Sequence, residues 1–165
     1  TRWNDKHQNT AIIVPMDGYH LSNEQLKEAG TLHLKGVPKT FDAVGFVNKI
    51  RKIKNEPNKI HYCPLFDRSI EASIQDEIRV LPTHTMIIVE GNYLILESEL
   101  WASLRERFEV WFIEADAEAL AQRLLERHQS AGKNTQEAQE KMNSTDLPNA
   151  ELIGNTRSRA TRIVR

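Results

Sequence analysis

The sequence of 165 residues lacks several features that mark whole classes of protein. Its one cysteine, Cys63, excludes an intrachain disulfide and a zinc site built from several cysteines. No apolar run approaches the roughly 20 residues that cross a bilayer, and no signal-peptide pattern opens the chain. The 22 Lys and Arg residues face 23 Asp and Glu residues, so no surplus of positive charge attracts nucleic acid or an anionic membrane. We therefore expect a cytoplasmic protein without nucleic-acid or membrane partners.

Hydrophobic residues make up 39% of the chain and charged residues 27%, an ordinary balance for a globular protein. The length suits one well-cored domain and is short for two. We expect a single domain over residues 1–165.

Three short apolar runs of β-branched or aromatic residues predict strands at residues 11–14, 86–89 and 110–113. None of them alternates polar with apolar residues. Continuous apolar runs of this length favour strands that are covered on both faces, as in a parallel sheet.

Helical patterns lie between these runs. Ser22 and Gln25 form a capping-box pattern that predicts a helix from Asn23 to Ala29. Asp42 is the expected cap of the next helix, with one apolar face made by Val44, Val47, Ile50 and Ile53. Further helices are predicted around residues 100–108, 120–125 and 135–143, a fresh helix start at Asp146-Leu147-Pro148, and a last strand over residues 160–164. The alternation indicates an α/β fold with a mostly parallel sheet. Residues 30–39 and 65–73 show neither the helical nor the strand repeat of hydrophobic residues, and we interpret them as substrate loops.

Two carboxylates directly follow predicted strands. Asp17 and Glu90 each come after an apolar run, and each precedes a glycine that lets the chain turn sharply. If both strands are parallel, both acids lie at the carboxyl edge of the sheet, where ligands bind in open α/β sheets. Such a pair suits Mg²⁺ and an activated hydroxyl. The alternative is that each acid–glycine pair is only a turn signal. Because two such pairs each follow a predicted core strand, we consider this alternative the weaker one.

Five elements in this order resemble a known family. Met16-Asp17-Gly18-Tyr19-His20 resembles the Asp-x-Phe/Tyr-Tyr/His element of the uridine kinase, phosphoribulokinase and bacterial pantothenate kinase group. The others are Thr40-Phe41-Asp42, Tyr62 to Arg68, Glu90-Gly91-Asn92-Tyr93 and the arginine-bearing Arg123 to His128. Asp146-Leu147-Pro148-Asn149 and Thr156-Arg157 are similar to the fructose- or uridine-kinase-like bacterial branch. The resemblance extends from about Ala11 to the end of the chain.

The resemblance implies a P-loop NTPase-like, three-layer αβα fold with a lid around residues 123–145. It implies an ATP- and Mg²⁺-dependent kinase that transfers the γ-phosphate to a hydroxyl of a small metabolite. A nucleoside such as uridine, a sugar and a pantothenate-like molecule stay open as acceptors. A homodimer is implied as well.

Roles follow from the resemblance position by position. Asp17 is the expected general base and reaches Mg²⁺, whereas Glu90 belongs to the metal shell. Asp42 accepts hydrogen bonds from substrate hydroxyls, and the other residues of the acceptor pocket are His20, Tyr62, Asp67 and Arg68. Arg123 and Arg127, four apart on one helix face, close over the phosphates, and Arg127 and Arg157 contact ATP. The alternative for the helix arginines is an exposed face with ion pairs to neighbours such as Glu126.

One element of the family is not in the sequence. The phosphate-binding Gly-x-x-x-x-Gly-Lys-Ser/Thr loop is absent. The one Gly-Lys pair, Gly132-Lys133, precedes Asn134 and comes after the arginine-bearing helix. We expect a strand, the P-loop and part of a helix to lie upstream, with Thr1 to Asn4 as the tail of that helix.

Two other functions remain possible on this sequence. A relative without the P-loop would bind nucleotide or metabolite without turnover, but the joint presence of Asp17, Glu90, Arg123 and Arg127 argues against such a relic. A phosphohydrolase of another α/β class is more remote, because the Asp-x-Asp nucleophile element is absent after the first strand.

We predict that these 165 residues alone have little or no kinase activity and poor solubility. Without the P-loop, the chain has neither the phosphate cradle nor the lysine charge, and a central strand of the sheet is missing. A coupled assay of ADP formation and size-exclusion chromatography test this. A stable monomer with turnover contradicts the prediction.

Overall fold

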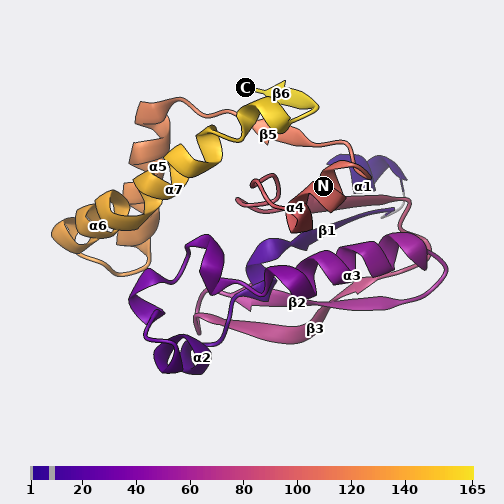
Figure 1. The fold of residues 1–165 in the computed structure, drawn as a ribbon, viewed down its shortest axis with the longest axis horizontal. Coiled ribbons are helices and arrows are strands. Elements are labelled where there is room, and N and C mark those ends of the chain that lie inside the picture. The colour runs from indigo at the N-terminus through magenta and orange to yellow at the C-terminus, as the bar shows by residue number, and fades with distance from the viewer. Residues whose placement is uncertain (1, 8–9) are drawn as a thin grey trace. The chain divides into compact units, whose positions relative to one another are not determined.

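The computed structural model describes residues 2–7 and 10–165 (Figure 1). The chain forms two compact units, Thr1–Leu94 and Ile95–Arg165. No helix in the described part of the chain is long and apolar enough to cross a membrane.

The described residues of the first unit form α-helices, 3₁₀ turns and strands. In chain order they are α1 (Arg2–His7), β1 (Ala11–Pro15), η1 (Met16–Tyr19), α2 (Asn23–Glu28), η2 (Leu32–Leu34), η3 (Pro38–Thr40), α3 (Ala43–Asn55), β2 (His61–Asp67), β3 (Ala72–Val80) and β4 (Met86–Glu90). β1 and β4 pair in parallel from Ala11↔Met86 to Pro15↔Glu90, and β2 and β3 form an antiparallel hairpin. The predicted parallel pairing of the first two apolar runs is confirmed.

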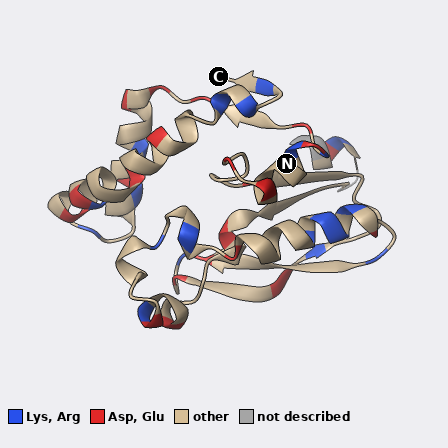
Figure 2. Cartoon of the chain, in the orientation of Figure 1, with Lys and Arg blue, Asp and Glu red and all other residues tan. Residues whose placement is uncertain are grey.

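Both predicted helix caps of this unit are confirmed. Ser22 and Gln25 form the reciprocal capping box at the start of α2. The Asp42 carboxylate accepts a hydrogen bond from the Gly45 N–H at 2.8 Å at the start of α3. Val44, however, is 58% exposed, and Phe46 takes its place on the buried face of α3. Lys52 and Lys54 lie in the last turn of α3, where basic residues gather (Figure 2) and complement the helix dipole.

The prediction of a loop over residues 65–73 is wrong, because most of this segment belongs to the hairpin. β2 continues to Asp67, and β3 begins at Ala72 after a tight turn at residues 68–71. Pro64 interrupts the alternation, which is why the segment carries no clear period. The segment 30–39 has no α-helix or strand and contains two short 3₁₀ turns.

The prediction that the apolar strands are covered on both faces is also wrong for the described residues. Val14 is fully buried, but Ile13 and Ile88 are each 43% exposed on β1 and β4. Beside Ile13 lies an open, mostly apolar hollow of about 470 Å³.

The free edge of β1 is closed by one side chain of α1. The Asn4 amide accepts a hydrogen bond from the Ala11 N–H at 2.9 Å and donates one to its carbonyl at 3.0 Å. Asn4 thereby replaces one rung of a strand partner at an edge of β1 that pairs with no strand in the described part of the chain. A helix at the start of the chain was expected and is present; Thr1 lies outside the described residues.

The second unit contains α4 (Glu99–Arg105), β5 (Trp111–Ile113), α5 (Ala117–Ser130), α6 (Thr135–Lys141), η4 (Met142–Asp146), α7 (Leu147–Gly154), η5 (Arg157–Arg159) and β6 (Arg162–Val164). β5 and β6 pair in parallel. The predicted third and last strands are therefore confirmed, and Phe108 lies beyond the end of α4.

Asp146 does not start a new helix. α6 runs into α7 through one π-helical turn, Met142–Asp146, and the Asp146 backbone is helical without a side-chain cap. Pro148 lacks the N–H that would bond the carbonyl of Ser144, and its ring would clash with that carbonyl in a regular helix. The wider π turn before Pro148 relieves this conflict.

We predict that Gly18→Ala destabilises the protein by about 1–3 kcal/mol, the usual cost of overpacking. A Cβ at Gly18 would lie 2.2 Å from the Pro64 carbonyl oxygen, which is backbone and cannot swing away. Gly154→Ala is the control, because a Cβ there meets nothing within 4 Å. Alanine in that helix is expected to stabilise slightly. Urea unfolding measures both changes, and equal free energies of unfolding would refute the packing argument.

Candidate active site

The two predicted acids come from neighbouring parallel strands. Pro15 is in register with Glu90, and Asp17 follows two residues later in the turn η1. Gly91 after Glu90 allows close packing, because a Cβ there would lie 2.5 Å from the Cβ of Met16. The strand pairing therefore brings both carboxylates to one edge of the β1–β4 pair.

The negative charge of Asp17 acts on Glu90. Partial burial raises the pKa of Glu90, and the negative charge of Asp17 raises it further, whereas Arg68 acts in the opposite direction. A positive charge or a proton near Glu90 would lessen this unfavourable effect.

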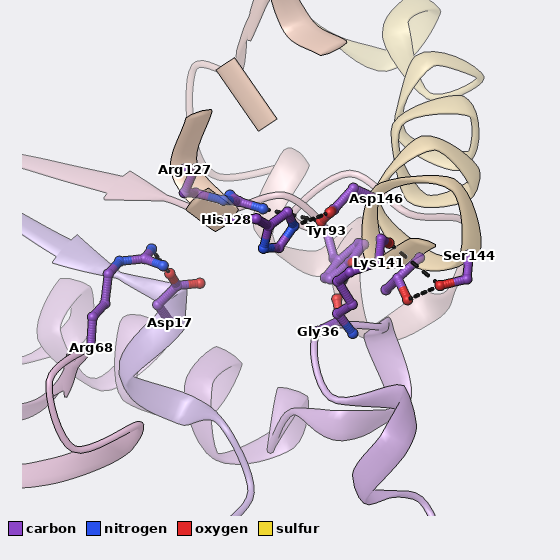
Figure 3. A network of polar contacts seen from close by, with 10 residues as sticks. Asp17, Gly36, Arg68, Tyr93, Arg127, His128, Lys141, Ser144 and Asp146 are labelled. Carbon is purple, nitrogen blue, oxygen red and sulfur yellow. Dashed lines mark hydrogen bonds and ion pairs between the residues drawn. The ribbon is translucent and has the colours of Figure 1, made fainter. Parts of the chain in front are cut away.

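Asp17 is bound by an arginine from the hairpin. Arg68, directly after β2, donates from Nη2 to Asp17 Oδ2 at 3.1 Å (Figure 3). The Arg68 side chain is 68% exposed, so this ion pair contributes little to stability. The contact matters for its position, because it places a positive group beside the Asp17 carboxylate.

His20 is packed in an aromatic cluster. Its ring stacks on Phe41 with a centroid distance of 3.9 Å and lies 4.8 Å from Phe66. Burial lowers the pKa of His20; the charge of Asp17 opposes this effect, and that of Lys35 adds to it. His20 is therefore suited to act as a neutral ring beside Asp17.

The loop over residues 30–40 is fixed by two residues to which the sequence assigned no role. Lys35 donates to Asn23 Oδ1 at 2.8 Å and to the Glu71 carbonyl at 2.7 Å, and its ammonium lies 5.1 Å from the Phe66 ring centroid. Tyr93 donates from its hydroxyl to the Gly36 carbonyl at 2.5 Å. The position of Tyr93 directly after the Glu90-Gly91 motif could have indicated a role for it. Lys35 lies in a segment with neither a helical nor a strand pattern, so its contacts could not be anticipated from the sequence.

The remaining acceptor candidates lie on α3 and the hairpin. Asp42 caps α3 through Oδ1, and Tyr62 is 42% exposed on β2. Both line one hollow with His20. Asp67 instead accepts hydrogen bonds from the N–H and hydroxyl of Ser69, which lower the pKa of its carboxyl and stabilise the hairpin turn.

In the second unit, Arg127 belongs to a polar cluster with His128 and Asp146. Asp146 accepts from Arg127 Nη2 at 3.0 Å through Oδ1 and contacts His128 Nε2 at 2.6 Å through Oδ2 (Figure 3). His128 is only 8% exposed. The partner of Arg127 is thus Asp146 on the π turn, not the neighbouring Glu126, whose carboxylate accepts from Gln122. Arg123 is exposed on the same helix.

Arg157 is held by an acid at the end of β5. Its Nε donates to Glu114 Oε1 at 2.6 Å, and Arg165 Nε donates to Oε2 of the same carboxylate at 2.6 Å. These arginines lower the pKa of Glu114, with the hydrogen bond from Arg165 as the largest cause. A role of Arg157 in binding ATP would require it to leave or share Glu114.

The known proteins that this chain resembles are named as kinases. The chain is 34% identical over 148 residues to ATP-dependent kinase-like protein notR′ of Aspergillus versicolor, covering 84% of this chain and 86% of that protein. ATP-dependent kinase YFH7 of Saccharomyces cerevisiae is 28% identical, over 89% of this chain and 53% of its own length. No family model matches the sequence.

Among solved structures, a candidate fructose transport system kinase of Silicibacter sp. superposes with a TM-score of 0.86 at 34% identity. The match covers 94% of this chain and 75% of that one. The structure of YFH7, a candidate P-loop kinase with a circular permutation, gives a TM-score of 0.79 at 27% identity, over 94% and 57% of the two chains.

We predict that Asp146→Ala lowers the free energy of unfolding by about 1–3 kcal/mol, because it leaves the buried His128 Nε2 without its partner. Glu97→Ala is the matched control. It removes a carboxylate that is 87% exposed and paired with Arg159, so its expected cost is below about 1 kcal/mol. Chemical denaturation followed by circular dichroism compares the two. Equal losses would show that Asp146 has no special structural role.

Proposed function

Because this chain belongs to the P-loop kinases of the uridine kinase type, we propose that it transfers the γ-phosphate of ATP to a hydroxyl of a small metabolite. The same relatives confirm the P-loop kinase fold expected from the sequence. The observation that carries the proposal is the pair Asp17 and Glu90 at the carboxyl edge of two parallel strands. Phosphoryl transfer depends on positioning and charge stabilisation, and this edge offers groups for both.

In this proposal, Asp17 is the general base. Arg68 contacts Oδ2 of its carboxylate, and we assign the other oxygen, Oδ1, to the acceptor hydroxyl. Arg68 then orients the base and remains beside the negative charge of the transferred group. The charge of Asp17 affects the pKa of His20, and we assign the His20 ring to the wall of the acceptor site next to Asp17.

The donor set of this edge fits Mg²⁺. In the part of the chain that the structure describes, no three His, Cys, Asp or Glu side chains gather into a metal site. Two carboxylates nevertheless suffice for Mg²⁺, which keeps water and substrate phosphates as its other ligands. Burial is the main cause of the raised pKa of Glu90 and Asp17 a further one; a bound cation would offset both. Glu90 would hold the ion, and Asp17 would reach it through a water ligand so that Oδ1 stays available to the acceptor hydroxyl; the ion would neutralise charge on the phosphates.

The arginines of α5 supply the positive charge for ATP in this proposal. We assign phosphate contacts to Arg123, which is exposed, and to Arg127, which would exchange the Asp146 carboxylate for a phosphate oxygen. Arg157 would contact ATP after a similar exchange with Glu114. In each pair the carboxylate holds the guanidinium in place until a stronger anion replaces it.

We expect Asp17→Asn to lower kcat by a factor of about 10² or more, while the KM for ATP changes little. The amide keeps the shape of the carboxylate but cannot accept the hydroxyl proton. The measurement is ADP formation by the full-length gene product with a panel of nucleosides, sugars and pantothenate.

Asp5→Asn, an exposed change on α1, is the control and is expected to leave turnover unaltered. Unchanged turnover in Asp17→Asn would remove Asp17 from the mechanism. Binding of ATP without turnover on any acceptor would favour a non-catalytic, nucleotide-binding protein instead.

A further inference from the structure

The proposed roles of α5 leave His128 unexplained. His128 directly follows Arg127 on this helix, and both side chains contact one carboxylate, that of Asp146 on the π turn (Figure 3). Arg127 contacts Oδ1 at 3.0 Å, and His128 contacts Oδ2 at 2.6 Å. A single acid thus binds an arginine to which we assign a phosphate contact and a histidine that has no assigned role.

The two partners of Asp146 differ in exposure. The Arg127 side chain is 49% exposed, whereas those of His128 and Asp146 are 10% and 15% exposed. A half-exposed guanidinium can turn to another anion, because arginine binds phosphate oxygens as it binds carboxylates. Departure of Arg127 would leave the Asp146 carboxylate in a mostly buried position, with His128 as its remaining side-chain partner in the described part of the chain.

The protonation of His128 determines how unfavourable that departure is. Because a carboxylate accepts and does not donate, Nε2 of His128 carries the proton of the 2.6 Å contact. A neutral imidazole offers Asp146 only this hydrogen bond, whereas an imidazolium adds a positive charge at the same distance. Nδ1 makes no hydrogen bond to a described residue, so it is available to a proton from solvent. Such a proton would compensate the charge that Arg127 leaves behind.

Other charges around His128 are less important than Asp146. The remaining charged side chains on α5 and on α6, which packs against it, lie at exposed or half-exposed positions, where water and salt screen them. They are Glu118, Arg123 and Glu126 on α5, Lys133 before α6, and Glu137, Glu140 and Lys141 on α6. His128 is also the one histidine of residues 95–165, and this range has no cysteine. Histidine is the side chain whose charge ordinarily changes near neutral pH.

We propose that His128 is a positioning residue for Arg127, and that transfer of Arg127 from Asp146 to a phosphate of the nucleotide is coupled to uptake of a proton by His128 Nδ1. The proton comes from the solvent and returns to it when Arg127 returns to Asp146. In between, the imidazolium holds the Asp146 carboxylate. The inference rests on the proposed function for the anion that binds Arg127.

The coupling has a defined sign. In the free protein, the positive guanidinium of Arg127 lies on the same carboxylate as His128 and therefore disfavours a second positive charge. Once Arg127 has left, the same proton is favoured. Nucleotide binding therefore takes up protons, and by linkage the binding becomes tighter as the pH falls.

The test measures proton uptake when the non-hydrolysable analogue AMP-PNP binds with Mg²⁺ to the full-length protein. Calorimetry in buffers of low and high ionisation enthalpy, PIPES and Tris, gives the number of protons. Since the nucleotide itself changes protonation, the relevant quantity is the difference between the wild type and His128→Gln. Glutamine keeps an N–H donor but does not titrate.

We expect the wild type to take up about 0.3 proton or more beyond His128→Gln near neutral pH. The ratio of wild-type to variant affinity for AMP-PNP should then rise about fourfold over a fall of two pH units, because each proton taken up changes affinity tenfold per pH unit.

Two further variants separate this coupling from a structural role. Arg127→Gln keeps His128 and Asp146 but removes the group that moves, and we expect it to lose the additional proton uptake as well. Arg127 is half-exposed, so this variant is expected to fold even if His128→Gln does not. His7→Gln, an exposed change on α1, is the control and is expected to retain the uptake. Circular dichroism checks that each variant is folded.

Equal proton uptake by the wild type and His128→Gln, or full uptake by Arg127→Gln, overturns the inference. Neither result affects the kinase proposal, which the turnover assay with Asp17→Asn tests separately. A protein that binds no AMP-PNP refutes both the inference and the proposed function. The two failures are therefore distinguishable.

Discussion

The parallel pairing of β1 with β4 is the constraint on which the candidate site depends. It places the end of one strand beside the end of the other, and therefore Asp17 and Glu90 at the same edge. Partial burial raises the pKa of Glu90, and repulsion by the negative charge of Asp17 raises it further. Arg68 compensates this charge in the structure described here, and the proposed metal ion and substrate phosphates would do so during turnover. The acids are thus an unfavourable arrangement that the strand pairing enforces and a ligand relieves.

The hairpin of β2 and β3 lies about 50 residues after Asp17 in the sequence, and it still supplies several contacts of this site. Arg68 after β2 reaches Asp17, Phe66 packs against His20, and the hairpin turn at Glu71 anchors Lys35. The register of the hairpin shifts at Pro64, which has no N–H to donate to the ladder, and Asp76 in the facing segment has a φ of +62°.

The sequence predicted the parts of the fold that short-range patterns govern. The three apolar strands and the caps at Ser22 and Asp42 are present as predicted, because strand-forming residues and caps act within a few positions. The hairpin escaped prediction, since Pro64 and a bulge disrupt its period of two. Asp146 looked like a helix start and instead bridges Arg127 and His128, which are 18 or more residues away. Partners at that separation leave no local pattern, so ion pairs and aromatic contacts required the structure.

The π turn between α6 and α7 sets a condition on chain length. A π turn holds one residue more than an α turn, and each helical residue rotates the next by about 100°. Loss of one residue within Met142–Asp146 would let the helix become regular only by turning α7 about its axis, or by kinking at Pro148. Insertions and deletions in this segment would therefore be felt along the whole of α7, whereas many substitutions at its exposed positions would not. The number of residues in this turn, more than their identity, sets the direction in which α7 faces.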